Sequence, residues 1–126
     1  MIAVIDYGAG NIQSVIKALE YIGCEDICVT NDKTVLAQAD AAILPGVGSF
    51  GHAMDCLHKA DLTDGVKSFI ASGKPFLGIC LGLQMLFEES EESPGVPGLG
   101  VLKGKICLIP CEYGYRSEER RVGKEC

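Results

Sequence analysis

Cys80 lies in the stretch whose residue types and spacing best suit covalent chemistry. It is the centre of Gly78-Ile-Cys-Leu-Gly82, between an apolar strand-like segment, residues 74–79, and a helix-like segment, residues 83–87. A strand, a sharp glycine-flanked turn with a nucleophilic residue at its apex, and a helix together make a nucleophile elbow. The glycines fit because so tight a turn leaves no room for side chains. The pattern predicts that Cys80 is a nucleophile at the carboxyl end of a strand, where a helix N-terminus favours the thiolate.

The alternative interpretation of Cys80 is a structural cysteine in an apolar run, because free cysteine behaves as a small hydrophobe. The strand before it and the helix after it favour the nucleophile. The chain has seven cysteines at irregular spacing: Cys24, Cys28, Cys56, Cys80, Cys107, Cys111 and Cys126. Their spacing is not that of a zinc site, and His52 and His58 do not complete one. We therefore expect no metal, and reduced thiols in a cytoplasmic protein.

Two glycine-rich turns follow predicted strands. Residues 41–44 lead into Pro45-Gly-Val-Gly-Ser-Phe-Gly51. A turn after a parallel strand lies at the carboxyl edge of the sheet, where ligands of α/β proteins bind, and its glycines let N–H groups turn towards a ligand. The other turn, Gly8-Ala-Gly-Asn11, has Asp32 downstream, as in a dinucleotide-binding motif, but Gln13 replaces the third glycine. We interpret it as a tight turn that lines a site rather than a pyrophosphate cradle.

The remaining pattern alternates strands and helices. Strands are predicted over residues 2–7, 26–30, 41–44 and 74–79, and helices over residues 12–22, 32–39, 52–58, 62–71 and 83–87. Residues 88–92 are predicted to be a solvated helix end, and residues 100–110 a further strand or hairpin arm. With 48% hydrophobic residues, this order predicts an α/β fold: a doubly wound, mostly parallel sheet flanked by helices in one domain.

Charge and hydropathy exclude several classes of function. The net charge is −6, and no basic patch precedes the last eleven residues, so nucleic acid and anionic membranes are not expected as partners. Apolar runs are too short to span a bilayer. The chain begins directly with a strand and has no basic segment of a signal peptide, which again predicts a cytoplasmic protein.

Residues 116–126 differ from everything before them. The stretch Arg-Ser-Glu-Glu-Arg-Arg-Val-Gly-Lys-Glu-Cys is densely charged and looks like a translated sequencing adapter rather than native protein. A natural disordered tail is the alternative. We expect residues 1–115 to be a partial domain, truncated at its C-terminal end, followed by a non-native tail over residues 116–126.

The glycine loop of residues 45–51 together with Gly78-Ile-Cys-Leu-Gly-Leu-Gln84 resembles the class I, or triad, glutamine amidotransferases. Within them the chain resembles the glutaminase subunits of imidazole glycerol phosphate synthases, which share Asp6-Tyr-Gly-Ala-Gly-Asn11 and the acidic stretch at residues 88–100. The resemblance covers about residues 1–110 and implies a flavodoxin-like fold. It implies that Cys80 attacks the side-chain amide of glutamine and that ammonia is released.

The resemblance also assigns roles around the cysteine. The N–H of Leu81 would be one oxyanion donor, and the second would come from Val47 and Gly48 in the glycine loop, which can require a peptide flip. Substrate glutamine would be held by Gly46, Gly48, Leu81 and Gln84. No cofactor is implied. The ammonia would pass to a (β/α)8-barrel cyclase subunit, which makes imidazole glycerol phosphate and AICAR in histidine biosynthesis.

One part of the family pattern is missing from the sequence. The family takes its base and the carboxylate that orients it from a His-Pro-Glu motif near the C-terminus, and this chain has no such motif. His52 and His58 fall on predicted surface helices, where neither is expected to act as the base. We therefore expect the chain as given to be inactive. Two other functions stay open on the residues alone: a flavodoxin-like module that binds a nucleotide or flavin, and a redox-sensing thiol protein.

Overall fold

A four-stranded parallel sheet forms the centre of the molecule. The computed structural model describes residues 1–110, so the predicted tail and the last residues of the predicted domain lie outside the described residues. The strands are β1 (Ile2–Ile5), β2 (Ile27–Thr30), β3 (Ala41–Leu44) and β4 (Phe76–Gly78), in the order β2-β1-β3-β4. Every pairing in this sheet is parallel. The four predicted strands and their parallel arrangement are confirmed: β3 has the predicted bounds, and the other three strands are shorter than predicted.

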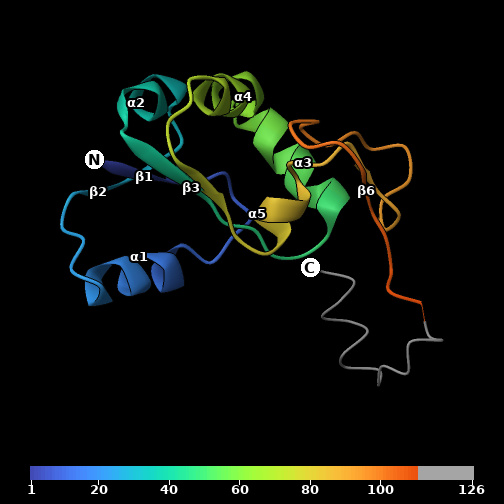
Figure 1. Ribbon diagram of the computed structural model, residues 1–126, viewed down its shortest axis with the longest axis horizontal. Helices are drawn as coiled ribbons and strands as arrows, with labels where there is room; N and C mark the ends of the chain where they lie inside the picture. The colour runs from blue at the N-terminus through green and yellow to red at the C-terminus, as the bar shows by residue number, and fades with distance from the viewer. Residues whose placement is uncertain (111–126) are drawn as a thin grey trace.

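Helices cover both faces of the sheet, as a doubly wound fold requires (Figure 1). Helix α1 (Ile12–Tyr21) lies on one face, and α2 (Lys33–Gln38), α3 (Phe50–Lys59) and α4 (Thr63–Ala71) lie on the other. Alternate residues of β1 serve the two layers, since Val4 packs with Leu19 of α1 whereas Ile5 belongs to the larger cluster beneath the other helices. No helix in residues 1–110 is long and apolar enough to cross a bilayer.

Side-chain caps fix where α2 and α3 begin. Asp32 accepts a hydrogen bond from the Thr34 N–H at 2.8 Å and caps α2. Ser49 accepts from the His52 N–H at 3.3 Å, so α3 begins at Phe50, two residues earlier than predicted. The cap therefore places the end of the glycine loop directly against the first turn of α3.

The acidic stretch at residues 88–92 is not a helix end. Helix α5 (Leu81–Gln84) stops early, and β5 (Glu89–Ser90) pairs in parallel with β6 (Lys105–Ile106) in a separate two-stranded sheet. The helix cannot continue because the following backbone is paired elsewhere: Leu102 donates to the Leu86 carbonyl and Gly100 to the Phe87 carbonyl. The helix predicted over residues 83–87 is therefore present but begins earlier and ends at Gln84, and the predicted solvated helix end at residues 88–92 was wrong.

Of the strand predicted over residues 100–110, only β6 (Lys105–Ile106) is present. Gly100 and Gly104 have positive φ angles of +67° and +124°, so the segment turns twice before it pairs. In Figure 1 this part of the chain lies beside α3 and outside the central sheet. The four-stranded sheet therefore ends at β4, whose outer edge has no neighbouring strand within residues 1–110. Beside that edge Leu77, Ile79 and Leu83 are exposed.

Candidate active site at the elbow

Cys80 occupies the apex of the turn between β4 and α5. Its backbone has φ +56° and ψ −118°, outside the regions that residues with a Cβ ordinarily occupy, and its side chain is exposed. Such a conformation costs about 1–3 kcal/mol and persists only when the surrounding structure holds it. The geometry agrees with the strained turn that the sequence predicted.

The two flanking glycines are required by close backbone packing. A Cβ at Gly78 would lie 2.8 Å from the Leu83 Cα, and a Cβ at Gly82 would overlap the Leu44 carbonyl oxygen. That oxygen also accepts the Ile79 N–H at 3.0 Å, which joins the elbow to the end of β3. The Leu83 N–H donates to the Cys80 carbonyl at 3.0 Å and closes the turn. These contacts hold Cys80 in its unusual conformation.

The glycine loop at residues 45–49 packs directly against the elbow. A Cβ at Gly46 would lie 2.7 Å from the Gly82 nitrogen and 3.0 Å from the Leu81 Cβ, so only glycine allows this approach. Beyond it Val47 and Gly48 are exposed, and Gly48 has φ +92°. The adjacent positions of β3 and β4 therefore bring the loop and Cys80 to one edge of the sheet.

Four backbone donors at this edge have no acceptor within the described part of the chain. Within residues 1–110 the N–H groups of Gly46, Val47, Gly48 and Leu81 donate to neither a backbone carbonyl nor a side chain. Unpaired N–H groups beside a nucleophile are suited to binding an oxyanion. Three of the four belong to the loop in which glycine permits the peptide planes to turn.

Gln84 is the buried polar residue of α5. It is 1% exposed, and within the described chain its Nε2 has no hydrogen-bond partner. An unpaired buried amide costs about 1–3 kcal/mol, so most such groups in proteins find a partner. A bound ligand with an acceptor atom would satisfy it.

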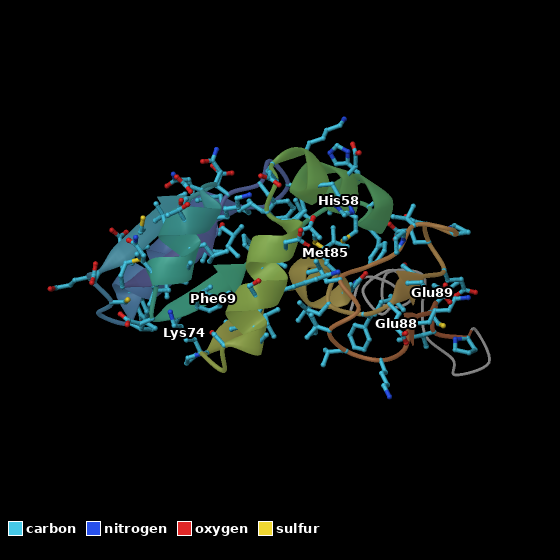
Figure 2. All side chains as sticks on the ribbon, turned by 90° about the horizontal axis from the view of Figure 1, so that it is seen from above. His58, Phe69, Lys74, Met85, Glu88 and Glu89 are labelled. Carbon is cyan, nitrogen blue, oxygen red and sulfur yellow. The ribbon has the colours of Figure 1, made fainter. Side chains whose placement is uncertain are left out.

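The two histidines are not brought to Cys80. Both lie on α3, where the His52 Nε2 is 3.5 Å from the Cys56 Sγ and the His58 Nδ1 is 2.8 Å from the Thr63 Oγ1. Figure 2 shows His58 on α3. Within residues 1–110 no histidine or carboxylate hydrogen-bonds to the Cys80 sulfur. Within the described residues, Cys80 and the unpaired N–H groups therefore lie together without a histidine or carboxylate bonded to the sulfur.

Two supports of the glycine loop were missed by sequence reasoning. The Tyr7 hydroxyl donates to the Pro45 carbonyl at 2.6 Å, at the start of the loop. At its other end the Glu92 carboxylate accepts the Phe50 N–H at 3.1 Å, and the Ser93 hydroxyl accepts the Gly51 N–H at 2.9 Å. Two features of the sequence could have pointed to these supports: Tyr7 directly follows a buried strand, and acidic residues are concentrated at residues 88–92. Neither feature specifies a partner about 40 residues away.

The described residues form no metal site, and the groove between α2 and α4 does not include Cys80 or the glycine loop. Among the described residues there is no group of three or more His, Cys, Asp or Glu side chains arranged to hold a metal ion. The five cysteines in this part of the chain are free.

A groove of about 510 Å³ runs between α2 and α4, where the Lys74 ammonium donates to the carbonyls of Ala37 and Ala39 at 3.0 and 2.8 Å. Figure 2 shows Lys74 beside Phe69, whose ring centroid is 5.3 Å from the ammonium nitrogen.

Comparison with known protein families decides what kind of domain this is. The family described as the CobB/CobQ-like glutamine amidotransferase domain matches residues 1–110. The chain belongs to this family. The match covers both the glycine loop and the elbow, and it agrees with the resemblance found in the sequence.

Individual relatives narrow the resemblance. The proteins named imidazole glycerol phosphate synthase subunit HisH are 53% identical in Aquifex aeolicus (strain VF5), over 85% of this chain and 52% of the relative. In Bacillus cereus (strain G9842) the identity is 54%, over 90% of this chain and 54% of the relative. In Trichormus variabilis the identity is 55%, over 90% of this chain and 53% of the relative. The resemblance to these subunits is confirmed, and the chain spans about half the length of the curated relatives it matches.

Solved structures support the same fold. A crystal structure described as a glutamine amidotransferase aligns with a TM-score of 0.71 at 23% identity and covers 86% of this chain and 57% of its own. A putative peptidase E from Listeria monocytogenes EGD-e aligns with a TM-score of 0.61 at 16% identity, over 80% of this chain and 62% of its own. At these identities the likeness concerns the fold alone, and it confirms the predicted α/β architecture.

Proposed function

We propose that the chain is the N-terminal part of a glutaminase subunit of imidazole glycerol phosphate synthase. The observation that carries the proposal is the strained Cys80 turn packed against a glycine loop with unpaired N–H groups. Such a site suits attack on a carbonyl carbon, because it offers a nucleophile and donors for the negative charge that develops on the oxygen. About 53% identity to HisH proteins supports glutamine as the substrate.

In this proposal Cys80 attacks the side-chain amide carbon of glutamine as its thiolate. The carbonyl oxygen becomes an oxyanion, bound by the N–H of Leu81 and by the loop at Val47 and Gly48. Collapse of the tetrahedral intermediate forms a glutamyl thioester and expels the amide nitrogen, which must gain a proton to leave as ammonia. Water then cleaves the thioester to glutamate and restores the thiol.

The substrate would be held close to the same edge of the sheet. Gly46, Gly48 and Leu81 supply backbone groups, and Gln84 supplies a side-chain amide whose Nε2 lacks a partner in the described chain. A glutamine carboxylate or carbonyl is an acceptor that such a donor can bind. No cofactor takes part in this chemistry.

The name of the relatives as synthase subunits supports a second subunit as partner. We propose a (β/α)8-barrel cyclase that receives the ammonia and forms imidazole glycerol phosphate and AICAR in histidine biosynthesis. We also propose that the complex is cytoplasmic, which the odd number of irregularly spaced cysteines supports. Neither nucleic acid nor a membrane is part of the proposal, which agrees with the net charge of −6.

The chain as given would not turn over glutamine. Its two histidines lie at positions 52 and 58, and neither is followed by proline and glutamate. Without a base that passes a proton to the leaving ammonia, an effect of about 10²–10⁴-fold is lost. We propose that residues 1–115 are a partial domain and that residues 116–126 are a non-native tail.

The gene itself provides the first test. Sequencing the reading frame beyond codon 115 should recover a His-Pro-Glu motif in place of the tail, and a complete native frame without it would overturn the catalytic proposal. The full-length protein, assayed with its cyclase, should form glutamate from glutamine. Cys80→Ala should abolish this activity but leave synthesis from added ammonia intact. Retention of glutamine-dependent synthesis by that variant would contradict the assignment of Cys80.

A further inference from the structure

Tyr7 is a buried phenol at the edge of the sheet where the glycine loop and the elbow meet. It follows β1 and is 5% exposed, and its hydroxyl oxygen lies 2.6 Å from the Pro45 carbonyl oxygen. Burial, with a smaller contribution from the Cys56 thiol, raises the pKa of Tyr7 well above its usual range. The phenol therefore stays protonated and remains a donor.

The single hydroxyl proton has two acceptors within reach. Besides the Pro45 carbonyl, the Met85 sulfur lies 3.4 Å away, just after α5. Thioether sulfur is a weak acceptor, and the contact to Pro45 is the shorter one, so the proton is donated to the carbonyl. Met85, labelled in Figure 2, is fully buried, so its thioether gives this hydroxyl an apolar neighbour.

The hydrogen bond fixes the orientation of the first peptide of the loop. Because the C=O and N–H of a trans peptide point in opposite directions, holding the Pro45 carbonyl also sets the direction of the Gly46 N–H. A Cβ at Gly46 would lie 2.9 Å from the Tyr7 oxygen, so phenol and loop are in close contact. The proline ring restricts the other side of this peptide. Rotation is left to the peptides around Val47 and Gly48.

We propose that Tyr7 is a positioning residue that orients the oxyanion loop for reaction at Cys80, an inference that rests on the proposed function. Tyr7 does not touch the reacting atoms. It acts through the Pro45 carbonyl. By fixing the peptide between Pro45 and Gly46, it sets the position from which the N–H groups of Gly46 to Gly48 point. Its loss is expected to affect the reaction step more than the binding of the substrate, because oxyanion donors act chiefly on the transition state.

The test uses the 126-residue chain and an alkylating probe, because the probe needs no base for a leaving group. A chloroketone analogue of glutamine places a carbonyl where the amide carbonyl would lie. The Cys80 thiolate forms an S–C bond with its methylene carbon, and chloride leaves. The maximal rate of alkylation and the half-saturating concentration are measured separately, and iodoacetamide, which lacks the amino-acid part, reports the intrinsic reactivity of the thiol.

Three variants separate the hydrogen bond from its surroundings. Tyr7→Phe removes only the hydroxyl. Tyr21→Phe makes the same change at a side chain that is 91% exposed and serves as the matched control. Met85→Leu keeps an apolar residue of similar volume and removes the sulfur. We expect Tyr7→Phe to lower the maximal rate about fivefold, as the loss of one neutral hydrogen bond would, with half-saturation changed less than twofold. The two other variants should behave like the unchanged chain.

A second measurement decides the point without relying on the chemistry. Backbone order parameters from NMR relaxation should fall at the Gly46 and Gly48 amides in Tyr7→Phe, towards values below about 0.6, and stay unchanged in α4. If the unchanged chain reacts with the analogue without saturation and no more selectively than with iodoacetamide, the proposed function fails, while the order parameters still test the anchoring of the loop. An unchanged maximal rate together with unchanged order parameters would overturn the role of Tyr7. An equal loss of rate with iodoacetamide would show a general effect on folding and would also overturn it.

Discussion

Replacing Gly82 by alanine tests whether the elbow depends on the close approach of two backbone segments. The added Cβ would overlap the Leu44 carbonyl oxygen and lie 2.9 Å from its carbon. These are backbone atoms at the end of a central strand, so the clash cannot be relieved by a change of rotamer. Either β3 or the elbow must move.

The expected cost follows from two terms. Forcing extra volume into packed structure costs about 1–3 kcal/mol, with the upper end appropriate for fixed backbone. Movement of the Leu44 oxygen also weakens the hydrogen bond from the Ile79 N–H, worth about 1 kcal/mol. We therefore expect Gly82→Ala to lower the free energy of unfolding by at least about 3 kcal/mol, a large part of the 5–15 kcal/mol typical of a domain.

Urea unfolding followed by circular dichroism measures this difference. With a slope of about 1–3 kcal/mol per molar, the midpoint should fall by about 1–3 M, and complete unfolding without urea would meet the same expectation. Gly73→Ala is the control, since Gly73 has φ +83° and open space around its Cβ position. It should cost about 1–2 kcal/mol from the backbone conformation alone. A Gly82→Ala variant no less stable than Gly73→Ala would refute the reasoning.

Four further predictions concern the supporting structure. Asp32→Ala should destabilise the chain by about 1 kcal/mol in urea unfolding because α2 loses its cap, whereas Asp32→Asn should be nearly neutral. Lys74→Met should cost about 1–3 kcal/mol in the same assay, since two carbonyls at the end of α2 lose a charged donor; a neutral effect would show that water replaces it. The hydrogen bond between Asp40 and the N-terminal ammonium lowers the pKa of that carboxyl and raises the pKa of the amine, so the pair should stabilise the fold fully only between about pH 3.8 and 8.0. That contribution should fade as the pH drops through the lowered carboxyl pKa or rises through the raised amine pKa; urea midpoints of the unchanged chain and Asp40→Asn should converge at both extremes. Leu77→Lys, at a side chain 54% exposed beside the open edge of β4, should reduce self-association in sedimentation at high concentration without lowering the urea midpoint.

Features specified by nearby residues could be predicted from the sequence. The elbow was found because Gly78 and Gly82 are needed at fixed positions before and after Cys80. The parallel sheet followed from short apolar strands that alternate with helices. In each case a short local pattern carries the signal, even where the contact that requires it, such as that of Gly82 with the Leu44 carbonyl, joins distant residues.

Features that depend on distant partners could not be predicted. The acidic residues after α5 form a good helical pattern, yet their backbone pairs with residues 98–106, and this tertiary pairing overrides local propensity. The support of the glycine loop by Tyr7 joins residues 38 positions apart, and the Glu92 bond to Phe50 joins residues 42 apart. A single sequence gives no register for such contacts, so the supports of the site were found only in the structure.

The most direct test of the central claim is to identify which cysteine reacts with a glutamine-like electrophile. The chain is treated with a limiting amount of the chloroketone analogue, with and without excess L-glutamine, and the modified peptides are mapped by mass spectrometry. Among the seven cysteines, Cys80 should be labelled first, and L-glutamine but not D-glutamine should protect it. Equal labelling of the exposed Cys107, with no protection by glutamine, would contradict the assignment of Cys80 as the nucleophile of a glutamine site.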